Sequence, residues 1–167
     1  MKFIIHFKEG NENMEFDLSG SISKMCLSVI DFDLPLVSNL ANVSSLLFSY
    51  FKNTTWCGFY LSFEDKEELF LGPFQGEVAC TRIPFGKGAC GNACAKKTTQ
   101  LIPNVHLYEG HIACSKATNS EIVVPIILDG KVKGVIDLDS DKFANFTYKD
   151  KEELEEIANI LSPLFAR

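Results

Sequence analysis

Two stretches of the chain carry apolar residues at the three-to-four-residue spacing of an amphipathic helix. The first follows Asp33, a candidate cap, and Pro35, which suits a first turn; its apolar positions are Leu36, Leu40, Val43, Leu47 and Phe51. The second begins at Thr147, where Asp150 completes a capping-box variant, and its apolar positions are Leu154, Ile157, Leu161 and Phe165. Pro163 should bend or fray the end of this second helix. The pattern therefore predicts two helices, each with one buried face.

The remaining apolar segments are typical of strands. Residues 56–63 and 69–72 flank a polar segment and predict one hairpin, and a clearer hairpin joins residues 122–128 to 132–138 through Asp129-Gly130, a dipeptide that favours a tight turn. Shorter strands are expected at residues 3–8, 14–18, 78–83 and 100–102, with a short helix at 89–97. Residues 103–120 form a long polar loop, a feature that often serves as a lid or a site. Together these elements predict one α+β domain, an antiparallel sheet with helices on a face.

Composition narrows the class of function. A chain of 167 residues that is 46% hydrophobic has the size and mixture of one domain with a full core. The 16 basic and 22 acidic residues give a net charge of −6, which argues against binding nucleic acid or anionic lipid. No apolar run approaches the roughly 20 residues that cross a bilayer, and the N-terminus does not resemble a secretory signal. We therefore expect a cytoplasmic protein that is not bound to a membrane, with its cysteines kept reduced.

The six cysteines are unevenly placed, because four of them fall between residues 80 and 114. Cys26 and Cys57 lie in apolar segments and are expected to be small buried residues. Cys80, Cys90 and Cys114 border segments rich in glycine, threonine or charge, where solvent or a ligand can reach a thiol. A thiol redox cycle needs one cysteine that attacks and one that resolves the product, and these loops supply both.

Zinc binding is an alternative use of these cysteines. His111 and Cys114 are three residues apart, and Cys90 and Cys94 are four apart, which are possible spacings on helical turns. The sequence contains no Cys-x-x-Cys pair, so the common paired pattern of zinc sites is missing.

Acidic and aromatic residues give two further clusters. Asp137 and Asp139 are two apart on one strand and share a face, and the hairpin brings Glu121 to the same end. Three converging carboxylates would retain a proton near neutral pH. The alternatives are that Asp137 and Asp139 cap a strand end beside Asp141, or that the cluster holds calcium or magnesium, which the nearby cysteines make less natural. Trp56 and Tyr60 share a strand face and form either core packing or a wall for a small apolar group.

Several motifs in a fixed order carry a resemblance to a known family. They are Trp56-Cys57-Gly58-Phe59-Tyr60, Leu71-Gly72-Pro73-Phe74-Gln75-Gly76, Val78-Ala79-Cys80, Phe85-Gly86-Lys87-Gly88-Ala89-Cys90-Gly91, Gly110-His111-Ile112-Ala113-Cys114, Ser120-Glu121-Ile122-Val123-Val124-Pro125-Ile126 and Gly134-Val135-Ile136-Asp137-Leu138-Asp139. In these segments the chain closely resembles the free methionine-(R)-sulfoxide reductases, small enzymes built on a GAF domain. The resemblance runs from residue 35 to the C-terminus and is less clear over the first 34 residues. Cys94 departs from the family pattern.

This resemblance implies a fold and a set of site residues. The fold would be a single GAF-like domain over residues 1–167, with a central antiparallel sheet flanked by helices and the substrate enclosed between the sheet and the cysteine-bearing loops. Cys114 would be the nucleophile, Cys80 the resolving cysteine and Cys90 a third redox cysteine. The implied substrate-binding residues are Trp56 and Tyr60 at the methyl group, and Glu121, Asp137 and Asp139 around the sulfoxide and the rest of the substrate.

The implied reaction is the reduction of free L-methionine (R)-sulfoxide to L-methionine. It would pass through a sulfenic acid on Cys114 and a disulfide with Cys80, which thioredoxin would reduce. We expect no metal and no cofactor, and a homodimer is one assembly that the resemblance allows. Two other functions stay open at this point: a GAF module that senses a cyclic nucleotide or chromophore, and a structural zinc-binding domain.

Overall fold

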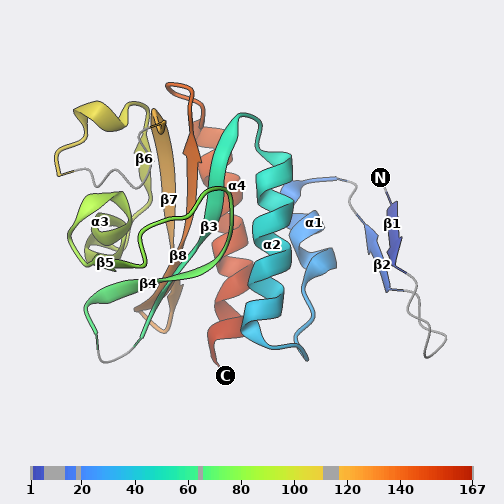
Figure 1. Ribbon diagram of the computed structural model, residues 1–167. Coiled ribbons are helices and arrows are strands. Elements are labelled where there is room, and N and C mark those ends of the chain that lie inside the picture. The colour runs from blue at the N-terminus through green and yellow to red at the C-terminus, as the bar shows by residue number, and fades with distance from the viewer. Residues whose placement is uncertain (1, 6–13, 18–19, 64–65, 111–116, 167) are drawn as a thin grey trace.

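A computed structural model describes residues 2–5, 14–17, 20–63, 66–110 and 117–166. Its centre is a six-stranded antiparallel sheet in the order β5-β4-β3-β8-β7-β6 (Figure 1). The strands are β3 (Thr54–Ser62), β4 (Glu68–Gln75), β5 (Arg82–Pro84), β6 (Gln100–Ile102), β7 (Ser120–Leu128) and β8 (Lys131–Ser140). The prediction of an α+β fold with a central antiparallel sheet and flanking helices is confirmed.

Helices cover the two faces of the sheet unequally. Helices lie on both faces of the sheet (Figure 1). The helices of the first face are α1 (Ile22–Val29), α2 (Leu36–Tyr50) and α4 (Tyr148–Leu161), and the opposite face carries α3 (Gly88–Lys96). A separate two-stranded sheet of β1 (Lys2–Ile5) and β2 (Met14–Asp17) lies beyond α1, where the sequence predicts two short strands.

Alternation along the central strands sorts their side chains between these two faces. On β3, Cys57 and Phe59 join the core beneath α1, α2 and α4, whereas Trp56 and Tyr60 point to the α3 side. The same parity holds on β8, where Ile136 and Leu138 pack under the helices. Because both faces are covered, the sheet has one thick apolar core and a second, smaller one, and the smaller one is continuous with the site.

Local signals explain several elements. Asp129 and Gly130 take φ values of 51° and 73°, as the predicted tight turn between β7 and β8 requires. Thr147 and Asp150 form a reciprocal capping box at the start of α4, and the chain changes to a 3-10 turn over Ser162–Ala166, which contains Pro163. These three predictions are confirmed.

Other predictions need correction. Helix α2 begins at Leu36 with Pro35 at the cap position, so Asp33 is not its cap. The strand expected at residues 78–83 is shorter and covers Arg82–Pro84, and of the residues before it Val78 and Ala79 line a pocket. The loop at residues 103–120 contains a short 3-10 turn, Val105–Leu107. Helix α1 was not predicted at all. Within the described residues, each helix is too short or too polar to cross a membrane.

Candidate active site

A pocket lies on the α3 side of the sheet, under the segments that carry Ala79 and Thr118. Its empty space, including the part open to solvent, is about 520 Å³. Val78, which is 91% exposed, marks the solvent-facing mouth. The described residues that line it are Trp56, Tyr60, Val78, Ala79, Ile83, Gly88, Ala89, Cys90, Thr118, Glu121, Asp137 and Asp139.

Strand register brings the acidic residues to this pocket. Glu121 on β7 pairs directly with Asp139 on β8, and Asp137 lies two residues further along the same face. Glu121 and Asp137 are 6% and 5% exposed, whereas Asp139 is half-buried. The three carboxyl groups predicted to converge therefore do so, and the two most buried ones sit on central strands.

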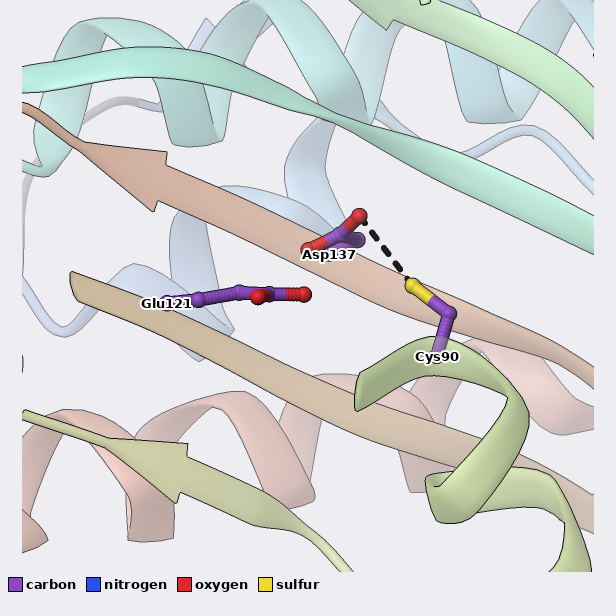
Figure 2. Close-up of side chains that lie close together, drawn as sticks. All are labelled: Cys90, Glu121 and Asp137. Atoms are coloured by element: carbon purple, nitrogen blue, oxygen red, sulfur yellow. Dashed lines mark hydrogen bonds between the residues drawn. The ribbon is translucent and has the colours of Figure 1, made fainter. Parts of the chain in front are cut away.

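Helix α3 adds a thiol to the carboxylates. Cys90, in the first turn of α3, is 3% exposed, and its thiol donates a hydrogen bond to Asp137 Oδ2 at 3.2 Å (Figure 2). Ligand atoms of Cys90, Glu121 and Asp137 all lie within 4.8 Å of one another. The second oxygen of Asp137, Oδ1, is buried and has no hydrogen-bond partner among the described residues.

Burial makes these groups hold their protons. The pKa of Asp137 is raised well above its usual value by burial and then by the charge of Glu121, and the Cys90 hydrogen bond offsets only part of this. Burial and the neighbouring Asp137 likewise raise the pKa of Asp139, against a hydrogen bond from Thr118. The pKa of the Cys90 thiol rises too, because it is buried beside carboxylates. The pocket thus favours the protonated form of its aspartic acid side chains.

Aromatic side chains of the neighbouring strand β3 form the wall beside these carboxyl groups, with Trp56 directly paired with Asp139. The rings of Trp56 and Tyr60 stack with centroids 5.8 Å apart, and Phe74 stacks on Trp56 at 5.4 Å. The Trp56 indole donates a hydrogen bond to the carbonyl of Glu77 at 3.1 Å, which fixes the orientation of the ring. Burial and the nearby carboxylates raise the pKa of Tyr60, so its phenol remains a hydrogen-bond donor.

The pocket gathers six of the eight residues that the sequence proposes for a site. They are Trp56, Tyr60, Cys90, Glu121, Asp137 and Asp139. Cys80 is half-buried, disulfide-bonded and adjacent to the pocket residue Ala79. Cys114 lies outside the described residues, as does the His111 of the zinc alternative.

The other cysteines are placed as follows. Cys26 and Cys57 are buried free thiols in the core, which confirms their expected place. Cys94 is also a buried free thiol, one turn along α3 from Cys90, and it does not line the pocket. The sequence reasoning missed Thr118, whose only signal was its place in the long polar loop.

Comparisons with known proteins identify the family. The GAF domain model matches residues 38–165. The free methionine-R-sulfoxide reductase of Escherichia coli (strain K12) is 45% identical over 130 residues, which cover 78% of this chain and 78% of that protein. The free methionine-R-sulfoxide reductase of Saccharomyces cerevisiae is 50% identical over 132 residues, covering 75% of this chain and 73% of the relative.

A solved structure agrees with this result. It is that of the free methionine-R-sulfoxide reductase from Neisseria meningitidis in complex with its substrate. It is 41% identical, covers 89% of this chain and 92% of its own, and superposes with a TM-score of 0.78. With a pocket of thiol, carboxyl groups and aromatic wall on the same fold, this chain belongs to the free methionine-R-sulfoxide reductase family of GAF-domain proteins.

Proposed function

We propose that this protein reduces free L-methionine (R)-sulfoxide to L-methionine with cysteine as the reductant. The observation that carries the proposal is the pocket itself: Asp137, with a buried oxygen that lacks a described partner, faces the same space as the Trp56–Tyr60 wall. An apolar wall suits the methyl group, and a proton donor suits the sulfoxide oxygen. The names of the relatives point to the same substrate.

The first chemical step transfers the oxygen atom from substrate to protein. The Cys114 thiolate attacks the sulfoxide sulfur while an acid protonates the oxygen that leaves. Asp137 suits this role. Its Oδ2 accepts the hydrogen bond from Cys90, so the proton that the carboxyl group retains is carried by Oδ1, the oxygen without a described partner. Methionine is released, and Cys114 is left as a sulfenic acid. A protonated acid beside the thiol also avoids the repulsion that a carboxylate would exert on a thiolate.

The second step regenerates the thiols. The Cys80 thiol attacks the Cys114 sulfenic acid, and a disulfide forms with loss of water. A dithiol reductant, which we propose to be thioredoxin, reduces this disulfide by exchange. Cys90 is the cysteine among the described residues that line the pocket, and it is proposed as a relay to the same disulfide.

Enclosure limits the substrate to the free amino acid. The lining side chains Tyr60, Glu121 and Asp137 are at most 6% exposed, so a ligand that reaches them is largely surrounded by protein. A polypeptide on either side of the methionine would need an exit for two further chain segments, and burying its unpaired peptide groups is costly. Methionine sulfoxide within proteins should therefore be a poor substrate.

The test is methionine formation, measured by chromatography with dithiothreitol as reductant, from the free (R) form, the free (S) form and a peptide-bound sulfoxide. Turnover of the free (R) form alone supports the proposal, whereas comparable rates on the peptide contradict the enclosure argument. Cys114→Ser should abolish turnover in a protein that still folds, and Cys94→Ser serves as the matched control because Cys94 does not line the pocket. Replacing dithiothreitol by thioredoxin, thioredoxin reductase and NADPH then tests the electron donor separately.

A further inference from the structure

The pocket is bounded at one end by the junction where β7 begins and β8 ends. Glu121 is the second residue of β7, and Asp139 is the last but one of β8. Ser120 pairs with Ser140 at this junction, one residue outside the pair of Glu121 and Asp139. The chain reaches the junction from Thr118, a pocket residue that is 4% exposed and shares a hydrogen bond with Asp139. The geometry of these three pocket residues therefore depends on how the junction is held.

Asn119, the residue just before β7, makes four hydrogen bonds within the described part of the chain. Its backbone N–H donates to the carbonyl of Ser140 at 2.8 Å, and its own carbonyl accepts the N–H of Val105 at 3.0 Å. Its side-chain amide donates to the carbonyl of Asp141 at 2.8 Å, and its side-chain oxygen lies 2.8 Å from His106 Nε2. One residue thus joins the end of β8 to the 3-10 turn that Val105 begins.

An amide side chain suits both side-chain contacts, because it offers a donor and an acceptor. The carbonyl of Asp141 can only accept, so the amide N–H must face it. The amide oxygen then faces His106, whose Nε2 is the donor. Aspartate would present an acceptor to the carbonyl of Asp141, and alanine would make neither contact. A side chain without both groups therefore loses at least one of the two hydrogen bonds.

We propose that Asn119 is a positioning residue whose side chain clamps the junction of β7 and β8, holds Thr118 and Asp139 in place, and so sets the affinity of the pocket for its substrate. Asn119 is not among the described residues that line the pocket, so it acts through these two neighbours. The clamp rests on the hydrogen bonds given above. Its effect on substrate affinity rests on the proposed function.

Steady-state kinetics with free methionine (R)-sulfoxide test the effect on the substrate. We expect KM to rise about 5- to 10-fold in Asn119→Ala, as for the loss of one hydrogen bond in the pocket, with kcat changed by less than about 2-fold. Asn119→Asp should show the same rise, because it keeps the acceptor and loses the donor. Thr118→Val, which loses the hydroxyl group, should reproduce the effect, and Thr118→Ser, which keeps it, should have the KM of the wild type.

Asn145→Ala is the matched control. Asn145 is half-buried, as Asn119 is, and also makes two side-chain hydrogen bonds, to the carbonyl of Lys52 at 3.0 Å and to Asn53 Nδ2 at 3.2 Å. Neither bond involves a described residue of the pocket lining. Both variants should lose a similar amount of stability in urea, but only Asn119→Ala should raise KM. A merely structural role predicts instead that the two variants behave alike.

Quenching of tryptophan fluorescence by acrylamide reports on the clamp without any reaction. Trp56 is the only tryptophan of the chain, is 6% exposed, lines the pocket and is paired with Asp139. Loss of the clamp should open this end of the pocket locally and raise the quenching constant about 2-fold or more in Asn119→Ala. Asn145→Ala should keep the quenching constant of the wild type.

Two results would overturn the proposal. The first is an Asn119→Ala or Asn119→Asp protein that is folded by circular dichroism and has the KM and the quenching constant of the wild type. The second is an Asn145→Ala protein that shows the same changes as Asn119→Ala. Quenching that rises in Asn119→Ala without a change in KM overturns the role in substrate affinity and leaves the proposed function standing.

Failure of the proposed function gives a different result. In that case the wild type reduces no sulfoxide, and the quenching experiment alone decides about the clamp. A rise in the quenching constant that is confined to the Asn119 variants then supports the clamp, whereas an unchanged constant overturns it.

Discussion

Replacing Gly91 with alanine should displace helix α3 and, with it, the Cys90 thiol. Gly91 is buried in α3, where its backbone lies against β5. A Cβ built at this position collides with the carbonyl oxygen of Pro84. It also lies 3.1 Å from the backbone nitrogen of Gly86, which is closer than the 3.4–4 Å of an ordinary van der Waals contact. Both neighbours are backbone atoms, so they cannot rotate away as a side chain would.

Two effects of opposite sign decide the outcome. Alanine is the better helix former by about 1 kcal/mol, which alone would stabilise the protein. Overpacking of a tight contact costs about 1–3 kcal/mol, and the immobile neighbours at Pro84 and Gly86 place this site near the upper end. We therefore expect the free energy of unfolding to fall by about 2 kcal/mol. Because the Cys90 to Asp137 hydrogen bond of 3.2 Å depends on the position of α3, kcat/KM should fall as well, and a displacement of about 1 Å can cost about 100-fold.

Urea denaturation and steady-state kinetics measure the two effects. Ala95→Gly is the matched control, because Ala95 is an exposed position of the same helix and reports propensity without contact. That variant should lose about 1 kcal/mol and keep its kcat/KM. A Gly91→Ala protein that is more stable than the wild type, with unchanged kcat/KM, would refute the claim that this contact positions the thiol.

Three further predictions concern single groups. Thr147→Ala removes half of the capping box of α4, so urea denaturation should show a loss of about 1 kcal/mol, and an unchanged midpoint would mean that the box contributes nothing. Burial raises the pKa of Cys26 and of Cys94 to about 12, from 9.0 in the unfolded chain. Between these values only the unfolded state releases the protons, so the free energy of unfolding should fall as pH rises from 9 to 12. At pH 8.5 mass spectrometry should find neither thiol alkylated by iodoacetamide in the folded protein, and labelling of either would contradict its burial. Tyr60→Phe keeps the stack on Trp56 and removes the phenol, so KM for free methionine sulfoxide should rise about 3- to 10-fold with stability unchanged, whereas an unaltered KM would remove the phenol from substrate binding.

The convergence of the carboxyl groups could be predicted only in part, because it depends on one turn and on an irregularity in the strand pairing. Asp129-Gly130 pairs Leu128 with Lys131, a register that would place Glu121 opposite Leu138 on the other face of the sheet. A shift between Ile126 and Ile127, which the sequence pattern does not reveal, moves the pairing by one residue and places Glu121 opposite Asp139. Asp137 then shares their face because it is two residues from Asp139. Cys90 could not be placed in this way, because its position depends on how α3 docks on the sheet, and the resemblance to a family supplied that information.

Helix α1 shows where pattern reasoning falls short. Its apolar residues Ile22, Met25, Cys26 and Val29 do repeat at helical spacing, but the helix has only eight residues. An isolated helix needs roughly 12–15 residues to be stable in water, so α1 is held by tertiary contacts that a short pattern does not reveal. Ile22 and Cys26 are fully buried in the core shared with α2 and α4.

One cause connects the chemistry of this pocket to its choice of ligands. Asp137 lies on β8, which is paired on one side with β3 and on the other with β7, so the backbone around it is fixed and solvent is kept away. This burial favours the protonated carboxyl group, the form that donates a proton to the sulfoxide oxygen in the reaction we propose. The ammonium group of a free amino acid is a cation and a peptide nitrogen is not, so a carboxylate in this pocket favours a free substrate over a peptide.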